Sequence, residues 1–225
     1  MEITNGAQLR RALLEDNLVD LILKHYGDFV MHGGTAIWRC YGGNRFSRDV
    51  DFYSNLEPSA ESSFQKRFHK LLVDSGYPIR EEKYNNRTKT LHVILRGLDT
   101  TGKLDITFVA VKGAVAEYTR VDGSKRIIHA LGPEALINEK MDAYISKYEV
   151  GEHEAQDLYD MCILKDRLGK PSNTTLRRLS EFLAKVGEAP PKDERVLKQL
   201  VLSGGAPDFK GMIGLLQGWL DDAGK

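Results

Sequence analysis

The chain has 225 residues, 41% hydrophobic and 28% charged, which is the balance of an ordinary globular protein with one large domain or two small ones. Its 32 basic and 32 acidic side chains cancel, which argues against general attraction to nucleic acid, although a local basic patch can still bind phosphate. No apolar run has the length of a membrane span, and two distant cysteines argue against a disulfide framework, so we expect a cytoplasmic protein with no membrane contact.

The first half of the sequence predicts alternating helices and strands, because its apolar residues recur at helical spacing in some segments and at strand spacing in others. The elements expected there are a helix over 7–26, a short buried strand at 28–33, a helical turn over 35–41, a strand at 50–54, a helix over 59–75, and strands at 77–84, 89–96, 103–111 and 125–129. Asn85-Asn86 is the turn expected between the strands at 77–84 and 89–96.

At Gly132-Pro133 the predicted secondary structure changes from mixed helices and strands to helices alone, because the apolar residues beyond it recur at helical spacing. The helices expected there are 133–148, 153–168, 174–187, 193–203 and 208–222, with glycine and proline in the breaks. We therefore predict an α+β fold, with an α/β domain over 1–131 followed by a helical domain over 132–225.

Three acidic residues stand at or within strand-like runs, where a charge is unusual. Asp49 and Asp51 are two residues apart and so point to the same side of a strand, and Asp105 lies within the apolar run KLDITFVAV. Neighbouring carboxylates repel one another unless a cation compensates them, and Mg²⁺ prefers oxygen ligands and shares its sites with phosphates. The three acids therefore predict a site for Mg²⁺, or for Mn²⁺ in its place, that clamps a phosphoryl transfer.

The residues before the acid pair suit a triphosphate. Gly33-Gly34 lies between a strand and a helical turn, where backbone N–H groups and a helix N-terminus favour anions. Ser47 offers a hydroxyl, and Arg45 and Arg48 can neutralise phosphate charge. A lone Asp-x-Asp is more often a solvated pair and a lone Gly-Gly means little, but the ordered string HGGTAIWRCYGGNRFSRDVDFYS with a later strand-borne acid favours function.

Four segments in order resemble the motifs of the AbiEii/MenT-like nucleotidyltransferase toxins, within the polymerase-beta-like nucleotidyltransferase superfamily. They are GGTAIWRCYGGNRFSRDVDF, KLDITF, KMDAYISK and QDLYDM, which together cover roughly residues 30 to 165. The resemblance implies a polymerase-beta-like nucleotidyltransferase core over 1–131, with a mixed sheet and flanking helices. It also implies that the helical domain over 132–225 contributes Lys140 and Asp157 to the site.

The resemblance assigns roles to individual residues. The catalytic residues that it implies are Asp49, Asp51, Asp105, Lys140 and Asp157, of which the first three bind the metal. The nucleotide-binding residues that it implies are Gly33, Gly34, Thr35, Arg45, Ser47 and Lys147. Asp160, on the same helix face as Asp157, is expected to be structural. Without the resemblance, the pattern around Lys140 favours a surface lysine whose stem covers apolar side chains.

The chain departs from the resembled pattern at three positions. Glu154 and Gln156 stand where the fourth motif has Arg and Lys, and Lys147 stands where Arg is common. Lysine cannot supply the two-pronged hydrogen bonding of arginine. The loss of two positive charges bears on how this helix meets the nucleotide, and on which nucleotide or acceptor is used.

Other chemistries lack their patterns. Six histidines show no metal-ligand spacing, and neither a P-loop nor a Gly-x-Ser-x-Gly elbow occurs. Basic residues cluster around the expected hairpin: Arg80, Lys83, Arg87, Lys89 and Arg96. The cluster fits an RNA-backbone patch and a solvated hairpin face equally well.

The sequence thus predicts an enzyme that moves a nucleoside monophosphate from an NTP to an acceptor hydroxyl with Mg²⁺. The resemblance implies that the acceptor is a tRNA 3′ end, that the protein is the toxin of a toxin–antitoxin system, and that a cognate antitoxin exists. Two alternatives stay open: an enzyme that nucleotidylates a protein, and a degenerate, non-catalytic binding module. The intact acids argue against the second alternative, and the altered fourth motif keeps it open.

Overall fold

The computed structural model describes residues 3–56, 63–97, 99–186 and 189–223. The chain forms two compact units, and each is described by itself. Unit 1 comprises Met1–Cys40 and Ser47–Leu131, and unit 2 comprises Tyr41–Phe46 and Gly132–Lys225.

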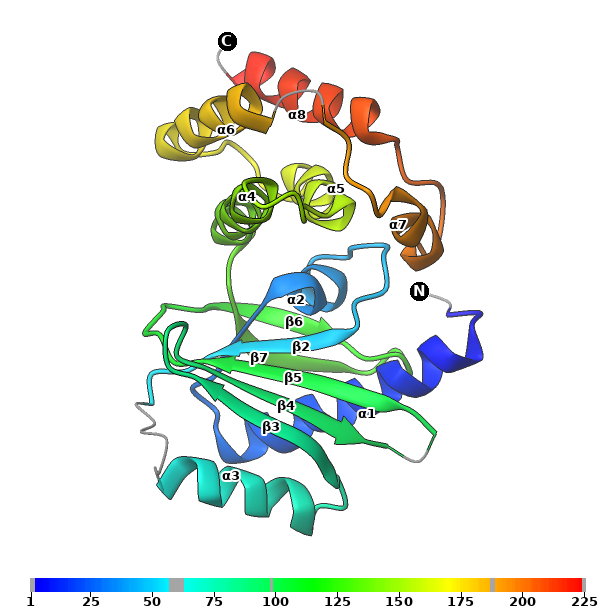
Figure 1. The fold of residues 1–225 in the computed structure, drawn as a ribbon, viewed down its shortest axis with the longest axis vertical. Coiled ribbons are helices and arrows are strands. Elements are labelled where there is room, and N and C mark those ends of the chain that lie inside the picture. The colour runs from blue at the N-terminus through cyan, green and yellow to red at the C-terminus, as the bar shows by residue number, and fades with distance from the viewer. Residues whose placement is uncertain (1–2, 57–62, 98, 187–188, 224–225) are drawn as a thin grey trace. The chain divides into compact units, whose positions relative to one another are not determined.

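Unit 1 is built on a mixed sheet (Figure 1). The seven strands of the described part are β1 (Val30–His32), β2 (Asp49–Tyr53), β3 (Ile79–Asn85), β4 (Thr90–Arg96), β5 (Thr101–Thr107), β6 (Ala114–Thr119) and β7 (Lys125–Ala130). They lie in the order β3-β4-β5-β2-β1-β7-β6. β2 pairs with β5 and β1 with β7 in parallel, and the other neighbours are antiparallel. β2 and β5 therefore lie side by side in the middle of the sheet, although three other elements separate them in the sequence.

Alternation along β2 and β5 gives the sheet one buried face and one open face. Phe52 of β2 and Leu104 of β5 are fully buried, whereas the residues on either side of them point the other way and are half-buried. We call the open side the acid face, because Asp49, Asp51 and Asp105 lie on it. The amino-acid alternation of these two strands thus decides which side of the sheet is available to a ligand.

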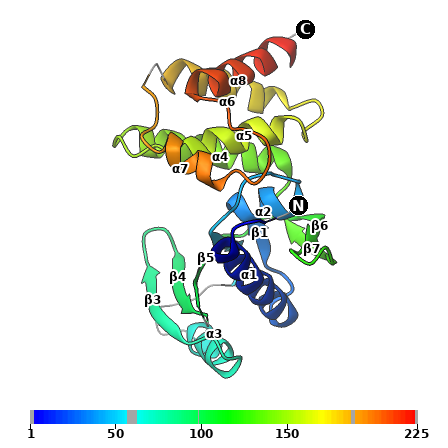
Figure 2. The same cartoon turned by 90° about the vertical axis from the view of Figure 1, so that its right-hand side faces the viewer.

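Two helices of unit 1 cover the buried face, α1 (Gly6–His25) and α3 (Ser63–Asp74), as Figures 1 and 2 show. Leu14 of α1 packs on β5 so closely that a Cβ added to Gly102 would lie 3.0 Å from the leucine side chain. Phe64 of α3 meets Phe108 edge-on, with ring centroids 5.4 Å apart. A third helix, α2 (Gly33–Cys40), follows β1 without a loop.

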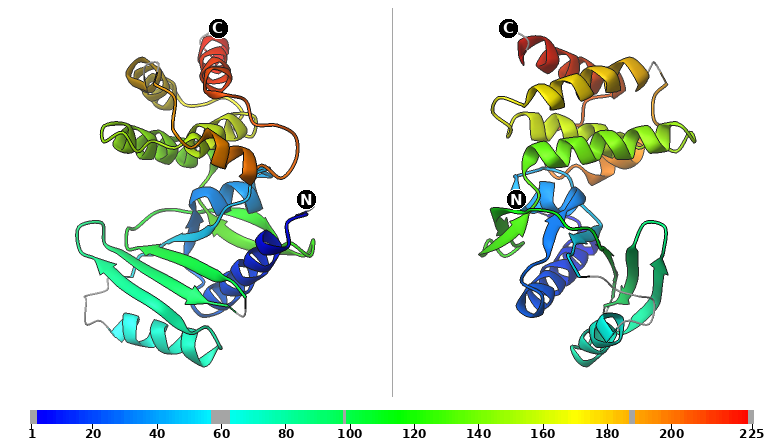
Figure 3. Two further views of the ribbon diagram at one scale, coloured as in Figure 1. Left: turned by 45° about the vertical axis from the view of Figure 1, so that its right-hand side comes forward. Right: turned by 90° about the vertical axis from the view of Figure 1, so that its left-hand side faces the viewer.

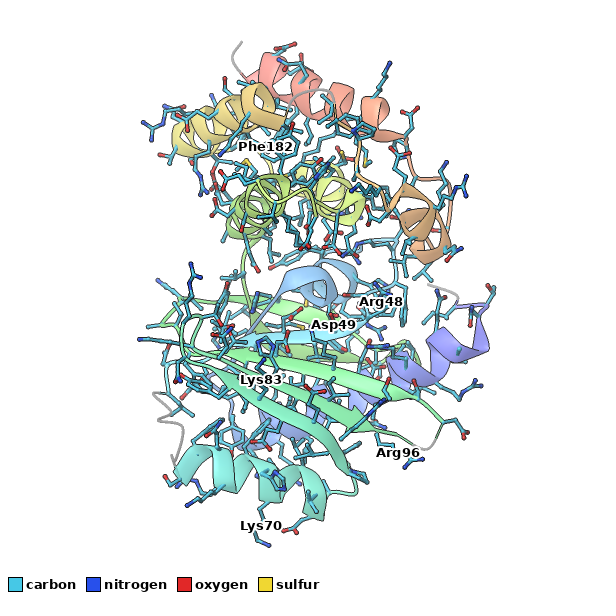
Figure 4. The ribbon with its side chains drawn as sticks, in the orientation of Figure 1. Arg48, Asp49, Lys70, Lys83, Arg96 and Phe182 are labelled. Atoms are coloured by element: carbon cyan, nitrogen blue, oxygen red, sulfur yellow. The ribbon has the colours of Figure 1, made fainter. Side chains whose placement is uncertain are left out.

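Unit 2 is helical (Figure 3). Its helices are α4 (Pro133–Tyr148), α5 (Ala155–Lys165), α6 (Asn173–Val186), α7 (Glu194–Leu200) and α8 (Phe209–Ala223). Both α4 and α8 pack against α5 and α6, so the four longer helices enclose one apolar core. Phe182, labelled in Figure 4, is fully buried there.

The segment Tyr41–Phe46 belongs to unit 2, because it pairs with the chain around the end of α7. The N–H of Phe46 donates to the carbonyl of Leu200 and the N–H of Leu202 donates to the carbonyl of Asn44, both at 2.7 Å. Six residues from the N-terminal half are therefore part of the helical unit, in addition to the residues from Gly132 onward.

The predicted α+β class, with a mixed sheet followed by helices, is confirmed. Sequence reasoning missed β6, because this edge strand is largely exposed and its apolar alternation is weak. The strand expected at 103–111 ends at Thr107, and the turn expected at Asn85-Asn86 lies at residues 86–89. Residues 59–62 and 187 of two expected helices lie outside the described residues.

Candidate active site

The register of the sheet brings the three predicted metal ligands onto neighbouring positions. β2 and β5 pair with Asp51 opposite Asp105 and with Asp49 opposite Lys103. Because opposite residues of paired strands point to the same side, all three carboxylates lie on the acid face. Figure 4 labels Asp49 on β2. The alternation of β2 predicts that Asp49 and Asp51 share a face, and the strand pairing adds Asp105 beside them.

Two basic side chains of unit 1 offset part of this negative charge. The Nζ of Lys103 lies 2.9 Å from Oδ2 of Asp105 and 3.4 Å from Oδ2 of Asp49. From α1, Nη2 of Arg11 lies 3.5 Å from Oδ1 of Asp49 and donates to the carbonyl of Arg48. Burial disfavours the charged form of Lys103, but attraction to Asp49 and Asp105 outweighs burial and raises the pKa of the ammonium group above its ordinary value.

A histidine holds the other oxygen of Asp105. His92 lies opposite Asp105 on β4, and its Nδ1 is 2.9 Å from Oδ1 of Asp105. Sequence reasoning missed His92, Lys103 and Arg11. Only Lys103 carried a local signal, because it lies two residues before Asp105 in a strand and so shares its face.

Gly33 gives the carboxylate of Asp51 its space. The backbone of Gly33 has φ of 67°, in the left-handed region that side chains rarely adopt, and a Cβ there would lie 2.5 Å from Oδ2 of Asp51. Burial raises the pKa of Asp51 to about 6, opposed by the charge of His32 and reinforced by Asp49 and Asp105. His32 lies opposite Asp51 on β1 and stacks on Tyr53, with ring centroids 3.7 Å apart.

The other residues predicted near the triphosphate in unit 1 surround the start of α2 and β2. The hydroxyl of Thr35 donates to the carbonyl of Asp49 at 2.5 Å, which ties the first turn of α2 to β2. Gly34 and Ser47 are buried in the same unit. The structure thus brings Gly33 and Thr35 against the acid pair, and their roles in nucleotide binding stay predictions.

The side chains of the acid face are of the type that binds a divalent cation. Its three carboxylates are hard oxygen donors on adjacent strand positions, and the ammonium of Lys103 already stands in for a cation between two of them. As the described side chains stand, no group of three or more His, Cys, Asp and Glu residues closes around a metal position.

Unit 2 contains a network of six charged side chains, which we call the ion network: Arg45, Lys140, Lys147, Glu154, Asp157 and Asp160. The Nζ of Lys140 lies 2.8 Å from Oδ1 of Asp157 and 2.9 Å from Oδ2 of Asp160. The Nζ of Lys147 lies 2.9 Å from Oδ2 of Asp157 and also pairs with Glu154. Burial alone would raise the pKa of Asp157, but attraction to Lys140 and Lys147 outweighs it and lowers that pKa.

Arg45 has a carboxylate partner within unit 2. Its Nε and Nη2 donate to the two oxygens of Asp160 at 2.6 and 2.5 Å, in a buried two-pronged pair. The contact ties the Tyr41–Phe46 segment to α5, which agrees with the structural role expected of Asp160. The role in nucleotide binding predicted for Arg45 stays a prediction, and no described contact supplies it.

None of the helices within residues 3–56, 63–97, 99–186 and 189–223 is both long enough and apolar enough to cross a membrane.

Comparison with solved structures shows the fold of a nucleotidyltransferase. A nucleotidyltransferase candidate from H. pylori shares 23% identity, with a TM-score of 0.60 and 94% of each chain covered. JHP933 from Helicobacter pylori shares 22% identity, with a TM-score of 0.57 and coverage of 94% of this chain and 91% of that one. MenT4, the nucleotidyltransferase toxin Rv2826c from Mycobacterium tuberculosis H37Rv, shares 14% identity, with a TM-score of 0.56 and coverage of 97% and 86%. No curated protein matches.

A family profile matches most of the chain. Residues 18–217 match the family described as nucleotidyl transferase AbiEii toxin, type IV toxin–antitoxin system. The matched range contains the acid face and the ion network, and the family resemblance read from the four sequence motifs is confirmed. Members of the AbiEii family take an NTP as substrate, use a divalent metal ion and are paired with an antitoxin. The chain belongs to this family of nucleotidyltransferase toxins.

Proposed function

We propose that this protein transfers a nucleoside monophosphate from an NTP to the 3′-terminal hydroxyl of a tRNA, with Mg²⁺, or Mn²⁺ in its place, held by Asp49, Asp51 and Asp105. The observation that carries the proposal is the placement of these three carboxylates on one face of the paired strands β2 and β5. Divalent cations at such a site stabilise the charge that develops on the attacking and leaving oxygens.

Other residues of unit 1 have proposed roles in binding the triphosphate and in accepting the proton of the acceptor. The open space at Gly33 lets Asp51 reach the face, and the N-terminus of α2 presents backbone N–H groups to the triphosphate. Asp105 accepts the proton of the acceptor hydroxyl. The oxygen of that hydroxyl forms a bond to the α-phosphorus as the bond from the α-phosphorus to the bridging oxygen breaks, and pyrophosphate leaves with that electron pair.

The roles proposed in unit 2 follow the family motifs. Lys140 and Lys147 neutralise the triphosphate, and Asp157 orients both ammonium groups, to which its two oxygens lie within 2.9 Å. Ser47 and Arg45 complete the proposed set of nucleotide-binding residues. The contacts of Asp157 support its part, because one buried carboxylate holds both lysines in place.

The basic hairpin of unit 1 supports an RNA acceptor. Arg80, Lys83, Arg87, Lys89 and Arg96 are all exposed on β3, β4 and the turn between them. Lys83 lies opposite His92, and His92 lies opposite Asp105, so one cross-strand row leads from the hairpin to the acid face. Figure 4 labels Lys83 within β3 and Arg96 at the end of β4. Such a row can hold the phosphate backbone of an acceptor strand.

Toxicity would then follow from blocked tRNA 3′ ends in the cytoplasm, where tRNA and NTPs are found together. An antitoxin encoded beside this chain would relieve the growth arrest. Co-expression of the neighbouring gene with the toxin, scored as recovery of growth, tests this part of the proposal.

The test of the activity uses each α-³²P-labelled NTP with Mg²⁺, total tRNA and total protein. We expect label on tRNA, loss of that label in Asp51→Asn, and full labelling in Asp74→Asn, which changes an exposed acid of the same unit. Label on polypeptide would replace the tRNA proposal with protein nucleotidylation. No label on either acceptor, with no NTP binding, would leave a non-catalytic binding module.

A further inference from the structure

We propose that Lys103 is the resident counter-ion of Asp49 and Asp105, and that a divalent cation binds to the acid face by displacing its ammonium group. The inference rests on the proposed function, since it takes these carboxylates as ligands of the cation. It gives a role to Lys103, which lies in the KLDITF segment but to which the motif resemblance assigns none, and it describes which side chain the carboxylates contact before substrate arrives.

The contacts of Lys103 place its ammonium group where a shared cation would have to lie. Its Nζ is within 3.4 Å of one oxygen of Asp49 and within 2.9 Å of one oxygen of Asp105. These carboxylates come from adjacent strands, and Lys103 reaches both because it lies opposite Asp49 and two residues before Asp105. Asp49 and Asp105 are two of the carboxylates that would hold the cation, and Lys103 contacts one oxygen of each.

The remaining partners of the two carboxylates leave these oxygens to Lys103. Arg11 lies beside Oδ1 of Asp49, and His92 lies beside Oδ1 of Asp105, whereas Lys103 lies beside Oδ2 of each. Displacement of the Lys103 side chain therefore frees Oδ2 of Asp49 and Oδ2 of Asp105 together. Arg11 and His92 can keep their contacts and hold the carboxylates in orientation.

The exposure of the pair makes an exchange feasible. The side chains of Lys103 and Asp49 are each 39% exposed, so water and ions reach this contact, and an exposed ion pair is worth little. Asp105, the other partner of Lys103, is 16% exposed. Without any counter-ion, however, the carboxylates of Asp49, Asp51 and Asp105 would repel one another. Lys103 thus offsets this repulsion and competes with a cation for the same carboxylates.

The first test measures Mn²⁺ binding to the full chain by the electron paramagnetic resonance signal of free Mn²⁺. Because Lys103→Met removes the competitor, we expect its Kd for Mn²⁺ to fall about tenfold below that of the wild type, as expected for loss of a nearby like charge. The matched control is Lys125→Met, which removes an exposed lysine 2.7 Å from Glu117 in the same unit and should leave the Kd unchanged. Asp51→Asn should lose the site.

A second test uses the wild type alone, so that it does not depend on the folding of a variant. Lysines are reductively methylated with and without saturating Mn²⁺, and the rate at each lysine is read by mass spectrometry. We expect Mn²⁺ to raise the rate at Lys103 several-fold, because the ammonium loses both carboxylates, and to leave Lys125 unchanged.

The outcomes separate this inference from the proposed function. If the wild type binds Mn²⁺ but Lys103→Met binds it equally or more weakly, the inference is wrong and the cation site stands. An unchanged methylation rate at Lys103 in saturating Mn²⁺ also overturns it. If neither the wild type nor Lys103→Met binds Mn²⁺, both the inference and the proposed cation site fail.

Discussion

The two ionic clusters of this protein use the same kinds of side chain in opposite ways. On the acid face of unit 1, Asp49 and Asp105 are 39% and 16% exposed, and the basic groups around them lie 2.9 to 3.5 Å from their oxygens. In the ion network of unit 2, Asp157 and Asp160 are 3% and 1% exposed, and all four of their oxygens have basic partners within 2.9 Å.

The difference separates carboxylates that can exchange a partner from carboxylates that hold the fold. A buried charge that loses its partner is costly, so the ion network resists change. An exposed pair gains little from its contact, which is the property that the proposed exchange of Lys103 for a metal ion requires. Substitutions in each cluster test this contrast.

Replacement of a carboxylate on the acid face should remove activity without loss of stability. We expect Asp51→Asn to lower nucleotidyl transfer by at least about 10³-fold, because the ligand set for the cation is broken. The midpoint of thermal unfolding should stay the same or rise, since burial already disfavours charge on this side chain. A variant that keeps activity would contradict the assignment of Asp51 as a ligand.

Replacement of a carboxylate in the ion network should have the reverse effect on stability. Asp160→Ala leaves Arg45 and Lys140 buried without this partner, and we expect a loss of about 3–5 kcal/mol in the free energy of unfolding. Urea denaturation measures it. Asp166→Ala is the control: Asp166 pairs with Lys165 but is 69% exposed, so its loss should change stability by less than about 1 kcal/mol. Equal losses in the two variants would remove the contrast between buried and exposed pairs.

Gly33→Ala should disturb the acid face through the backbone. We expect a loss of roughly 1–3 kcal/mol from the left-handed φ, together with displacement of Asp51, whose oxygen lies 2.5 Å from the added Cβ position. Gly76→Ala is a matched control, because Gly76 has φ of 83° and nothing within 4 Å of its Cβ position. Both variants should lose stability, and only Gly33→Ala should also lose activity by about tenfold or more.

The pH dependence of stability should reveal a buried acid near the acid face. Burial raises the pKa of Glu15 from 4.5 to about 8, against the attraction of Arg11 and Arg39. Between pH 4.5 and about 8, Glu15 therefore keeps its proton in the folded state and loses it in the unfolded state. The free energy of unfolding falls as the pH rises through this range. Glu15→Gln should be more stable than the wild type by roughly 2–4 kcal/mol at pH 8.5, and equal near pH 4. Parallel stability curves for the two proteins would refute this.

The smallest effect is expected where the chain departs from its family. Glu154 pairs with Lys147, and both side chains are about one-third exposed, so Glu154→Gln should change stability by less than about 1 kcal/mol. If Lys147 binds the triphosphate, its release from Glu154 should lower KM for the NTP by about two- to fivefold, with kcat unchanged. Glu152→Gln, three residues from α5, is the control. An unchanged KM in Glu154→Gln would argue that Lys147 does not contact the nucleotide.

Much of the fold could be predicted because its signals are local. The apolar residues of α1 and of α4 to α8 recur at helical spacing, and β2 and β5 alternate apolar and polar side chains. β6 escaped prediction because an edge strand buries too little of its surface to show such a pattern. The segment Tyr41–Phe46 could not be assigned to the helical unit, because its hydrogen bonds reach residues far along the chain.

The features of the candidate site likewise separate into those that local sequence predicts and those that depend on tertiary structure. The sequence by itself determined that Asp49 and Asp51 share a strand face, that a glycine precedes them, and that Lys140 and Asp157 belong to helices, because periodicity and motif order are properties of neighbouring residues. Only the tertiary structure decided which charges meet. Lys103 and His92 reach Asp105, and Arg45 meets Asp160, because strand register and helix packing bring together residues that the chain keeps apart.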